Sequence, residues 1–330
     1  MSTREALLGA LAGGEVRSGS ALAASLGLSR AAVWKQVRRL RELGLDIHAV
    51  PGHGYRLARP LDLLDRSRIM SGLAAAARLA CESLEVAGVI SSTSAALVAA
   101  PAPAAGRWRC LLAEYQTAGR GRRGRRWLSP YGGGLCLSLA WSFAAAPRDL
   151  PALSLAAGVA ACRTLAVVGA GPVQLKWPND VLLGGAKLAG ILVDVDGDAR
   201  GPLRAVVGLG LNLVVPAGLR QDVVDDGGMA PVELDPAVVA AMGGRNALAA
   251  ALIGSMHGVL AGFAVDGFAP LAEEWRRHDY LCGRPVTITT GAARIAGIAA
   301  GIAADGALLV EGPEGIGAVY AGDVTLRDGS

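Results

Sequence analysis

Residues 119–127, with the sequence GRGRRGRRW, form the densest group in the chain that could do chemistry. They follow a segment whose composition is that of a β-strand. Glycine lets the backbone approach an anion closely, so that successive N–H groups can converge on it. Arginine adds planar, forked donors that suit phosphate oxygens. A disordered nucleic-acid-binding segment is the alternative, but the flanking strands and Trp127 favour an ordered anion site.

Three further blocks place polar residues beside apolar strands. Residues 176–180, KWPND, present a cation, an amide and a carboxylate at a turn that proline restricts. Lys187 begins an apolar strand, and residues 208–212, GLGLN, put glycines on a buried strand against which a ligand or another backbone can lie. Each block alone also has a structural explanation, namely a turn cap, a lysine that extends to water or tight sheet packing.

Alternating strand and helix patterns predict the α/β unit that positions these blocks. We expect strands over 86–90, 111–115, 135–143, 173–177, 187–195 and 204–215. We expect helices over 95–100, 153–168, 248–263 and 268–281. Short strands separated by glycine-rich turns follow, which predicts a small β-barrel or sandwich from 285–290, 294–302, 307–311, 316–320 and 324–326.

The first sixty residues predict two short helices, a third basic helix and a hairpin. Ser29 can cap the third helix, and Arg30, Lys35 and Arg38 lie on its polar side. Residues 45–57 have the pattern of a hairpin, or wing. This order favours a DNA-binding helix-turn-helix whose third helix enters the major groove. A basic, solvated helix in a small packing domain is the alternative.

Composition limits the remaining possibilities. The 330 residues are 52% hydrophobic and 18% charged, which favours two to three folded domains over disorder. Mean hydropathy is +0.40, but the most apolar stretch contains Arg163 and the N-terminus lacks the pattern of a signal peptide. Five scattered cysteines and four histidines have no ligand spacing, which argues against a disulfide framework or a zinc site. We expect a soluble, cytoplasmic protein.

Taken together, the blocks resemble the biotin protein ligases. Residues 114–127 are similar to the biotin-binding loop of that family, and residues 176–180, 187–192 and 208–212 match its other blocks in the same order. The N-terminal unit, with SRAA at 29–32 and PGHGY at 51–55, resembles the bifunctional branch, whose members also repress the biotin operon. Five ordered blocks are far more specific than any one of them.

The resemblance implies an α+β multidomain fold. It implies a winged helix-turn-helix over 1–64, a class II synthetase-like α/β catalytic domain over 65–279 and a small SH3-like β-barrel over 280–330. The implied reaction joins biotin to ATP, giving biotinyl-5′-AMP and pyrophosphate with Mg²⁺ as cofactor, and then transfers biotin to a lysine of a biotin carboxyl carrier protein. The other implied partners are biotin operon DNA and a second copy in a ligand-promoted homodimer, without a membrane.

The resemblance also implies roles for individual residues. The catalytic residues would be Lys187, Arg122 and Asp180. The biotin site would contain Ser92, Thr93, Ser94, Gln116, Gly119, Arg120, Gly121, Arg122, Trp127, Lys187, Gly190, Gly208 and Gly210, with the last three glycines letting the thin bicyclic ring lie against the sheet. The nucleotide site would contain Arg122, Arg125, Lys176, Asn179, Asp180, Asn212 and Met229, of which Lys176, Asn179 and Asp180 also serve the magnesium ion. DNA contacts would come from Ser29, Arg30, Lys35 and Arg38.

Two segments depart from the family pattern. Residues 91–94 read SSTS where the family often has Asp-Ser-Thr-Asn, so the amide is missing at Ser94. Residues 220–232 match a loop that closes over adenosine, with Met229 where many relatives have tryptophan. Asp222, Asp225 and Asp226 make this loop acidic, which would weaken closure unless it folds outward.

Two other functions remain open at this point. A relative of the lipoate or octanoate transferases would share the catalytic architecture, and a non-catalytic transcription factor would only sense a ligand. The segment at residues 119–127, here called the arginine loop, and the KWPND block favour biotin over lipoate. Lys187 and Arg122 argue against a purely sensory role.

Overall fold

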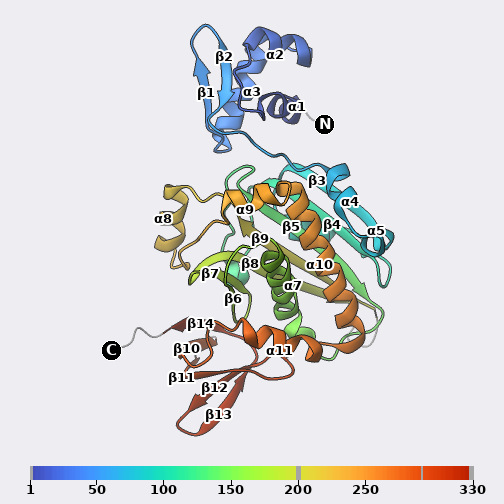
Figure 1. The fold of residues 1–330 in the computed structure, drawn as a ribbon, viewed down its shortest axis with the longest axis vertical. Helices are drawn as coiled ribbons and strands as arrows, with labels where there is room; N and C mark the ends of the chain where they lie inside the picture. Colours follow the sequence, from blue (N-terminus) through green and yellow to red (C-terminus); the bar gives the residue numbers. More distant parts are fainter. Residues whose placement is uncertain (1–2, 198–201, 291–292, 327–330) are drawn as a thin grey trace.

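The computed structural model describes residues 3–197, 202–290 and 293–326, which form three consecutive units (Figure 1). The first unit has three helices and a hairpin, α1, α2, α3, β1 and β2, at Thr3–Leu11, Gly19–Leu26, Arg30–Glu42, Ile47–Val50 and Gly54–Leu57. Leucines and valines from one side of each helix form its core. The helices and the hairpin lie where the sequence predicts them.

Serine side chains cap the N-termini of α2 and α3. The Ser18 hydroxyl accepts a hydrogen bond from the N–H of Ala21 at 3.0 Å, and Ser29 accepts from Ala32 at 3.2 Å. Gly27, with φ 64°, ends α2 in the left-handed region that glycine favours. The polar face of α3 is thereby held away from the core.

The second unit is built on a seven-stranded sheet in the order β3-β4-β5-β9-β8-β7-β6. In that order the strands are Cys81–Ile90, Trp108–Gln116, Gly134–Phe143, Leu203–Asn212, Ala186–Gly197, Asp180–Leu183 and Val173–Lys176. Only β3 and β4 are parallel among these neighbouring pairs. Every residue of β5 is buried, which explains its long apolar run.

Helices cover both faces of this sheet. One face packs against α7 (Leu153–Val167) and α10 (Arg245–Asp266), together with α4, α5 and α11 at Arg66–Gly72, Ala75–Ala80 and Ala269–Arg277. The short helix α6 (Thr93–Ala99) covers the other face, where Leu97 packs on residues of β4, β5 and β9. The N-terminus of α6 therefore points toward one end of the central strands.

Two segments are long and apolar enough to cross a membrane, Leu150–Val167 and Arg245–Asp266. In the fold they pack against each other and the sheet, with 67% and 50% of their apolar windows buried. Arg163 of α7 also forms an ion pair with Glu274 of α11 at 2.6 Å. A core helix of a soluble protein passes the same test of length and composition.

The third unit is one antiparallel sheet in the order β13-β12-β11-β10-β14. Its strands are Gly315–Val319, Leu308–Gly312, Ala293–Ile302, Pro285–Thr290 and Asp323–Leu326. Each lies within about a residue of its predicted position. The indole N–H of Trp177 donates to the carbonyl of Gly306 at 3.1 Å and joins this unit to the second one.

A buried ion pair anchors the linker between the first two units. Glu114 and Arg245 lie 2.9 Å apart, and their side chains are 5% and 6% exposed. The Glu114 carboxylate also accepts from the N–H of Leu64, and Arg245 donates to the carbonyl of Asp62. Tyr131 of the second unit completes the core of the first.

Several elements have no counterpart among the sequence predictions. They are α4, α5, β7, α8 (Ala217–Asp225) and α9 (Pro236–Ala241). Four of them are helices of nine residues or fewer, too short for a clear helical period. The predicted helix over 268–281 is shorter in the structure, because α11 ends at Arg277.

Candidate active site and nucleic-acid interface

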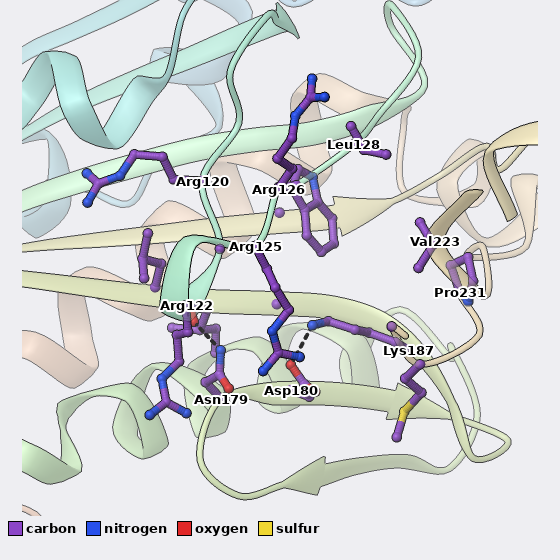
Figure 2. A pocket seen from close by; sticks show the side chains of 18 of the residues that line it. Arg120, Arg122, Arg125, Arg126, Leu128, Asn179, Asp180, Lys187, Val223 and Pro231 are labelled. Atoms are coloured by element: carbon purple, nitrogen blue, oxygen red, sulfur yellow. Dashed lines mark hydrogen bonds and ion pairs between the residues drawn. The ribbon is translucent and has the colours of Figure 1, made fainter. Parts of the chain in front are cut away.

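A cavity of about 690 Å³ contains all but one of the residues predicted to act on small-molecule ligands. Its floor is formed by β8 and β9, and the arginine loop lies over them (Figure 2). The start of α6, residues 226–229, Pro231 and β14 complete its walls. The exception is Gly119, which lines the adjoining hollow on the outer side of the arginine loop. Its carbonyl accepts from the N–H of Trp127 at 2.9 Å, so Gly119 closes the loop.

Uncharged polar groups gather at one end of the cavity. The N–H of Thr93 donates to Oε1 of Gln116 at 2.8 Å, and the Thr93 hydroxyl lies 2.8 Å from that of Ser138. The hydroxyls of Ser92 and Ser94 lie 3.1 Å apart, and Ser92 also caps α6. The four hydroxyl side chains are buried, which gives this end matched donors and acceptors without charge.

Ser138 is a lining residue that the sequence analysis did not identify. It lies in the middle of β5, where it is the one hydroxyl residue between Leu135 and Ala140. A polar residue inside a buried strand needs a partner or a ligand. A single serine within an apolar strand is therefore the feature of the sequence that could have predicted a ligand contact at Ser138.

The indole of Trp127 packs directly on the floor. A Cβ atom on Gly210 would collide with this ring, and one on Gly190 would lie 3.1 Å from its Cζ3 atom. These two glycines therefore accommodate the tryptophan, whereas the sequence led us to expect the biotin ring there. Gly208 differs, because it faces the hydroxyls, with Ser138 Oγ 3.4 Å from its ideal Cβ position.

Lys187 and Asp180 form an ion pair near the middle of the cavity (Figure 2). Nζ of Lys187 lies 2.7 Å from Oδ1 of Asp180, and the two side chains are 24% and 18% exposed. The ammonium also lies 5.9 Å from the centre of the Trp127 ring, within cation–π range. Neighbouring strands β7 and β8 hold both residues, so the cation has a fixed position.

Two amides hold the strand that carries Lys187. Nδ2 of Asn179 donates to the carbonyl of Ile191 at 2.7 Å, and Nδ2 of Asn212 donates to that of Lys187 at 3.1 Å. Lys176 lies beside them; burial lowers the pKa of its ammonium, while the Asp180 carboxylate acts in the opposite direction. Of the predicted nucleotide residues, Lys176, Asn179, Asp180 and Asn212 therefore lie together around β8.

The arginine loop is ordered by its own backbone. The N–H of Gly121 donates to the carbonyl of Arg125 at 2.7 Å, and Arg123 adopts a left-handed conformation with φ 54°. The side chain of Arg120 points away from the cavity and pairs with Asp194 of β8 at 3.0 Å (Figure 2). Only the backbone of Arg120 is thus available to a ligand in the cavity.

Three other arginines of the loop contact the third unit. Arg123 and Arg125 lie 3.2 and 2.6 Å from the same Asp323 carboxylate oxygen, and Arg122 donates to the carbonyl of Gly322 at 3.4 Å. Burial lowers the pKa of the Arg122 guanidinium, and the Asp323 charge opposes that shift. Asp323, which the sequence analysis also missed, is therefore a cavity residue contributed by β14.

The acidic segment after β9 lies over the opposite side. Met229 lines the cavity as expected, and Asp226 does so too. Asp222 and Asp225 are exposed, and Asp225 accepts from Gln221 at 2.7 Å. Two of the three acids thus face outward, which removes most of the expected obstacle to an anionic nucleotide.

The polar face of α3 carries the residues predicted to bind DNA. Arg30, Lys35 and Arg38 are exposed on it, and Ser29 uses its hydroxyl as the helix cap. Trp34 is 54% exposed on the same face, with the Arg38 guanidinium 5.6 Å from its ring centre. Cations and one aromatic side chain therefore share a surface that is free of packing contacts to the core.

Comparison with known proteins agrees with this geometry. The Bifunctional ligase/repressor BirA proteins of Salmonella typhimurium and Escherichia coli are each 38% identical over 325 residues, covering 97% of this chain and 96% of theirs. The chain belongs to the BirA family of bifunctional ligase/repressors. Family models match an HTH domain at residues 3–56, the Biotin/lipoate A/B protein ligase family at 89–212 and the Biotin protein ligase C terminal domain at 281–327.

Relatives outside the bifunctional branch match a shorter part of this BirA-family chain. The Biotin--[acetyl-CoA-carboxylase] ligase of Paracoccus denitrificans is 34% identical, over 71% of this chain and 96% of its own length. The biotin protein ligase of Aquifex aeolicus, solved in complex with biotin and ATP, has a TM-score of 0.60 at 25% identity and covers 75% of this chain and all of that one.

Proposed function

We propose that the chain is a cytoplasmic biotin–[acetyl-CoA carboxylase carrier protein] ligase that also represses biotin synthesis genes in response to biotin. It joins ATP and biotin into biotinyl-5′-AMP and pyrophosphate and then transfers biotin to a lysine of the carrier protein. The family supports the reaction and the HTH domain supports the repressor role.

The division of the cavity into an uncharged end and a cationic end carries the proposal. Ser92, Thr93 and Ser138 offer hydroxyls beside Gln116, and such a set suits the donors and acceptors of a cyclic urea. The cationic end, with Lys187 at its centre, suits a carboxylate next to a triphosphate. A single ligand with a neutral head and an anionic tail fits both ends.

The first step brings two anions together. A carboxylate oxygen of biotin attacks the α-phosphorus of ATP, and the bond to pyrophosphate breaks, with pyrophosphate taking the electron pair. Lys187 lies between the carboxylate and the phosphate, reduces their repulsion and stabilises charge on the phosphoryl oxygens. Arg122 and the loop N–H groups hold the acyl phosphate, and no enzyme nucleophile is required.

The second step consumes the mixed anhydride. The neutral amine of the acceptor lysine attacks the acyl carbon, an amide bond forms and AMP leaves with the electrons of the broken C–O bond. The amine proton passes to solvent. The arginine loop keeps the adenylate in the cavity until the carrier arrives.

The acidic side of the nucleotide site fits a magnesium ion. Magnesium in nucleotide sites is bound by one or two carboxylates together with substrate phosphates. Asp180 supplies such a carboxylate, and Asp226 lines the same cavity. Among the described residues no three His, Cys, Asp or Glu side chains form a ready cage, so substrate phosphates would have to supply the other ligands. Asp180 and Asn179 would position such an ion, which would neutralise phosphate charge when bound.

The repressor function uses the first unit. We place Arg30, Lys35 and Arg38 against DNA, with Ser29 fixing the start of their helix. One helix-turn-helix reads a half-site, so specific binding to the biotin operon requires a two-fold dimer. Adenylate bound against the arginine loop promotes dimerisation, so ligand raises DNA affinity without touching DNA.

We also propose the finer architecture. Residues 1–64 form a winged helix-turn-helix, residues 65–279 a class II synthetase-like catalytic domain and residues 280–330 an SH3-like barrel. Residues 1–2, 198–201, 291–292 and 327–330 within these ranges lie outside the described structure. The positions of the three matched family models support these boundaries.

One experiment separates this function from the other two. The chain is incubated with ATP, Mg²⁺ and labelled biotin, with and without a carrier domain, and pyrophosphate and protein label are measured. We expect biotin-dependent pyrophosphate release and label on the carrier. Activity with octanoate or lipoate instead would identify a transferase relative, and ligand binding without pyrophosphate release would identify a sensor. DNA affinity that ignores a biotin titration in the presence of ATP would refute the repressor function.

A further inference from the structure

The chain contains very few lysines. Of its 32 basic residues only Lys35, Lys176 and Lys187 are lysine, and the others are arginine. A guanidinium stays protonated in proteins and is not a nucleophile near neutral pH, whereas a lysine amine can react when it is deprotonated. The surface therefore offers very few side-chain amines to an acylating agent.

The three lysines occupy different environments. Lys187 is paired with Asp180 inside the cavity, and Lys176 lines the same cavity. Lys35 is exposed on α3, and among the described residues its side chain has neither a hydrogen bond nor an ion pair. It is the one lysine of the chain that lies on an open surface.

We infer that Lys35 is the site at which the chain acylates itself with its own acyl adenylate, and that this modification weakens its binding to DNA. The inference rests on the proposed ligase function, which supplies the adenylate. Lys35 lies in the first unit and outside the cavity lining. The donor is therefore an adenylate released to solvent or one held by a second copy.

The chemistry is that of the carrier reaction with a different amine. Nζ of Lys35, in its neutral form, attacks the acyl carbon of biotinyl-5′-AMP. A C–N bond forms, the C–O bond to phosphate breaks, AMP leaves with the electron pair and the amine proton goes to solvent. No co-reactant beyond the adenylate is needed.

The location of Lys35 gives the modification its consequence. Arg30, Arg38 and Lys35 share the exposed face of α3. An amide at Lys35 removes one positive charge from that face and adds a bulky, uncharged chain. Loss of one phosphate contact lowers the slope of log K against log salt by about 0.9. The modified chain is thus a weaker repressor, while its cavity is unchanged.

The site is tested with the full chain, ATP, Mg²⁺ and biotin in the absence of a carrier. Label is detected with streptavidin and located by mass spectrometry of peptides, for the wild type and for Lys35→Arg. We expect the label at Lys35 and its loss in Lys35→Arg, which keeps the charge. Label located mainly on Lys176, Lys187 or the N-terminal amine, or equal label in the variant, overturns the proposal.

Two parallel measurements separate this inference from the proposed function. Pyrophosphate release is measured in the same samples. If the chain releases no pyrophosphate, it makes no adenylate, and the result contradicts the proposed ligase function and not the assignment of Lys35. Biotin N-hydroxysuccinimide ester, an acyl donor that needs no enzyme activity, reports the intrinsic reactivity of Lys35. Failure of this ester to label Lys35 ahead of Lys176 and Lys187 overturns the assignment even if the ligase is active.

The consequence for DNA is tested with a random-sequence duplex. We expect the labelled fraction to elute from immobilised duplex at lower salt than the unlabelled fraction. We also expect free duplex, added before ATP and biotin, to protect Lys35 from label. Equal elution of the two fractions, or labelling that duplex does not reduce, overturns the proposed link to DNA binding.

Discussion

At the scale of single residues, Lys187 and Asp180 act as a pair, so the loss of one changes the other. Replacing Lys187 with alanine removes the central cation and leaves the Asp180 carboxylate, 2.7 Å from the lost ammonium, facing the incoming anions. We expect biotin-dependent pyrophosphate release to fall by about 10²–10³-fold, as for other lost contacts to a charged transition state. Circular dichroism checks that the fold survives. Release within about twofold of the wild type would show that Lys187 is not catalytic.

Met229 offers a second test at this scale. It lines the cavity in the segment that we expect to close over adenosine. Met229→Trp provides a larger π-face for adenine, which we expect to tighten ATP binding by on the order of 1 kcal/mol. Calorimetric titration with ATP measures the change. Unchanged or weaker binding would exclude this side chain from the adenine contact.

Some cavity residues could be predicted from the sequence, and others could not. The motifs predicted Lys187, Gln116 and Trp127 as cavity residues, because their blocks carry a local signature. Asp323 has no such signature, since it reads as a turn residue before a short strand. Its partner Arg125 is 198 positions away in the chain, and only the packing of the third unit brings them together.

At the scale of elements, the arginine loop depends on β14. Asp323 forms ion pairs with two arginines of the loop, whereas Asp194 forms an ion pair only with Arg120, on the outer side of the loop. We expect Asp323→Asn to free the loop, so that trypsin cleaves within residues 119–127 faster than in the wild type. Asp194→Asn is the matched control, because it leaves the contacts to β14 intact. Mass spectrometry measures the cleavage. Equal cleavage of Asp323→Asn and Asp194→Asn would contradict a specific role of Asp323 in holding the loop.

The packing of α11 on α7 has a predictable pH dependence. The Arg163 guanidinium holds the pKa of Glu274 below its ordinary value, through a hydrogen bond and its charge. The ionised carboxylate therefore stabilises the folded state above about pH 4, the ordinary range of glutamate, and this contribution disappears as pH falls through the lowered pKa. Because the pair is partly exposed, we expect it to contribute below about 1 kcal/mol.

Urea unfolding of Glu274→Gln and the wild type at several pH values measures the contribution of this ion pair to the free energy of unfolding. We expect the difference in unfolding free energy to be largest near neutral pH and to vanish in acid. Glu273→Gln on the same helix is the control, since its contacts to arginine are 3.6 Å or longer. A difference that grows as pH falls would contradict the assignment.

Helices and strands differ in how clearly the sequence predicts them. The long strand β5 was predicted to within one residue, because buried strands read as apolar runs, whereas β9 ends at Asn212, three residues before the predicted end. The short strand β7 was missed, although Gly184 and Gly185, both with positive φ, form the two-residue turn that joins it to β8. The strand has only four residues, which is too few for a distinct alternation of apolar and polar residues.

At the scale of the whole molecule, Tyr131 couples the first two units. Its ring is 2% exposed, stacks on Tyr115 with centres 6.2 Å apart and belongs to the core of the first unit. We expect Tyr131→Ala to destabilise the first unit by about 3 kcal/mol, in the range for lost large side chains. Calorimetry should show this unit melting separately. Tyr131→Phe, which keeps the ring, should retain the wild-type profile, and an unsplit transition in Tyr131→Ala would show that the units are coupled elsewhere.

The position of Trp127 also has an optical consequence. Its indole rests on Gly210, 5.9 Å from the Lys187 ammonium, so a ligand that occupies the floor of the cavity must move the ring and change the field around it. Indole emission responds to both. The entry of unlabelled biotin or ATP can therefore be followed by the wavelength and intensity of tryptophan fluorescence, with Trp127→Phe, which keeps the other five tryptophans, as the reference.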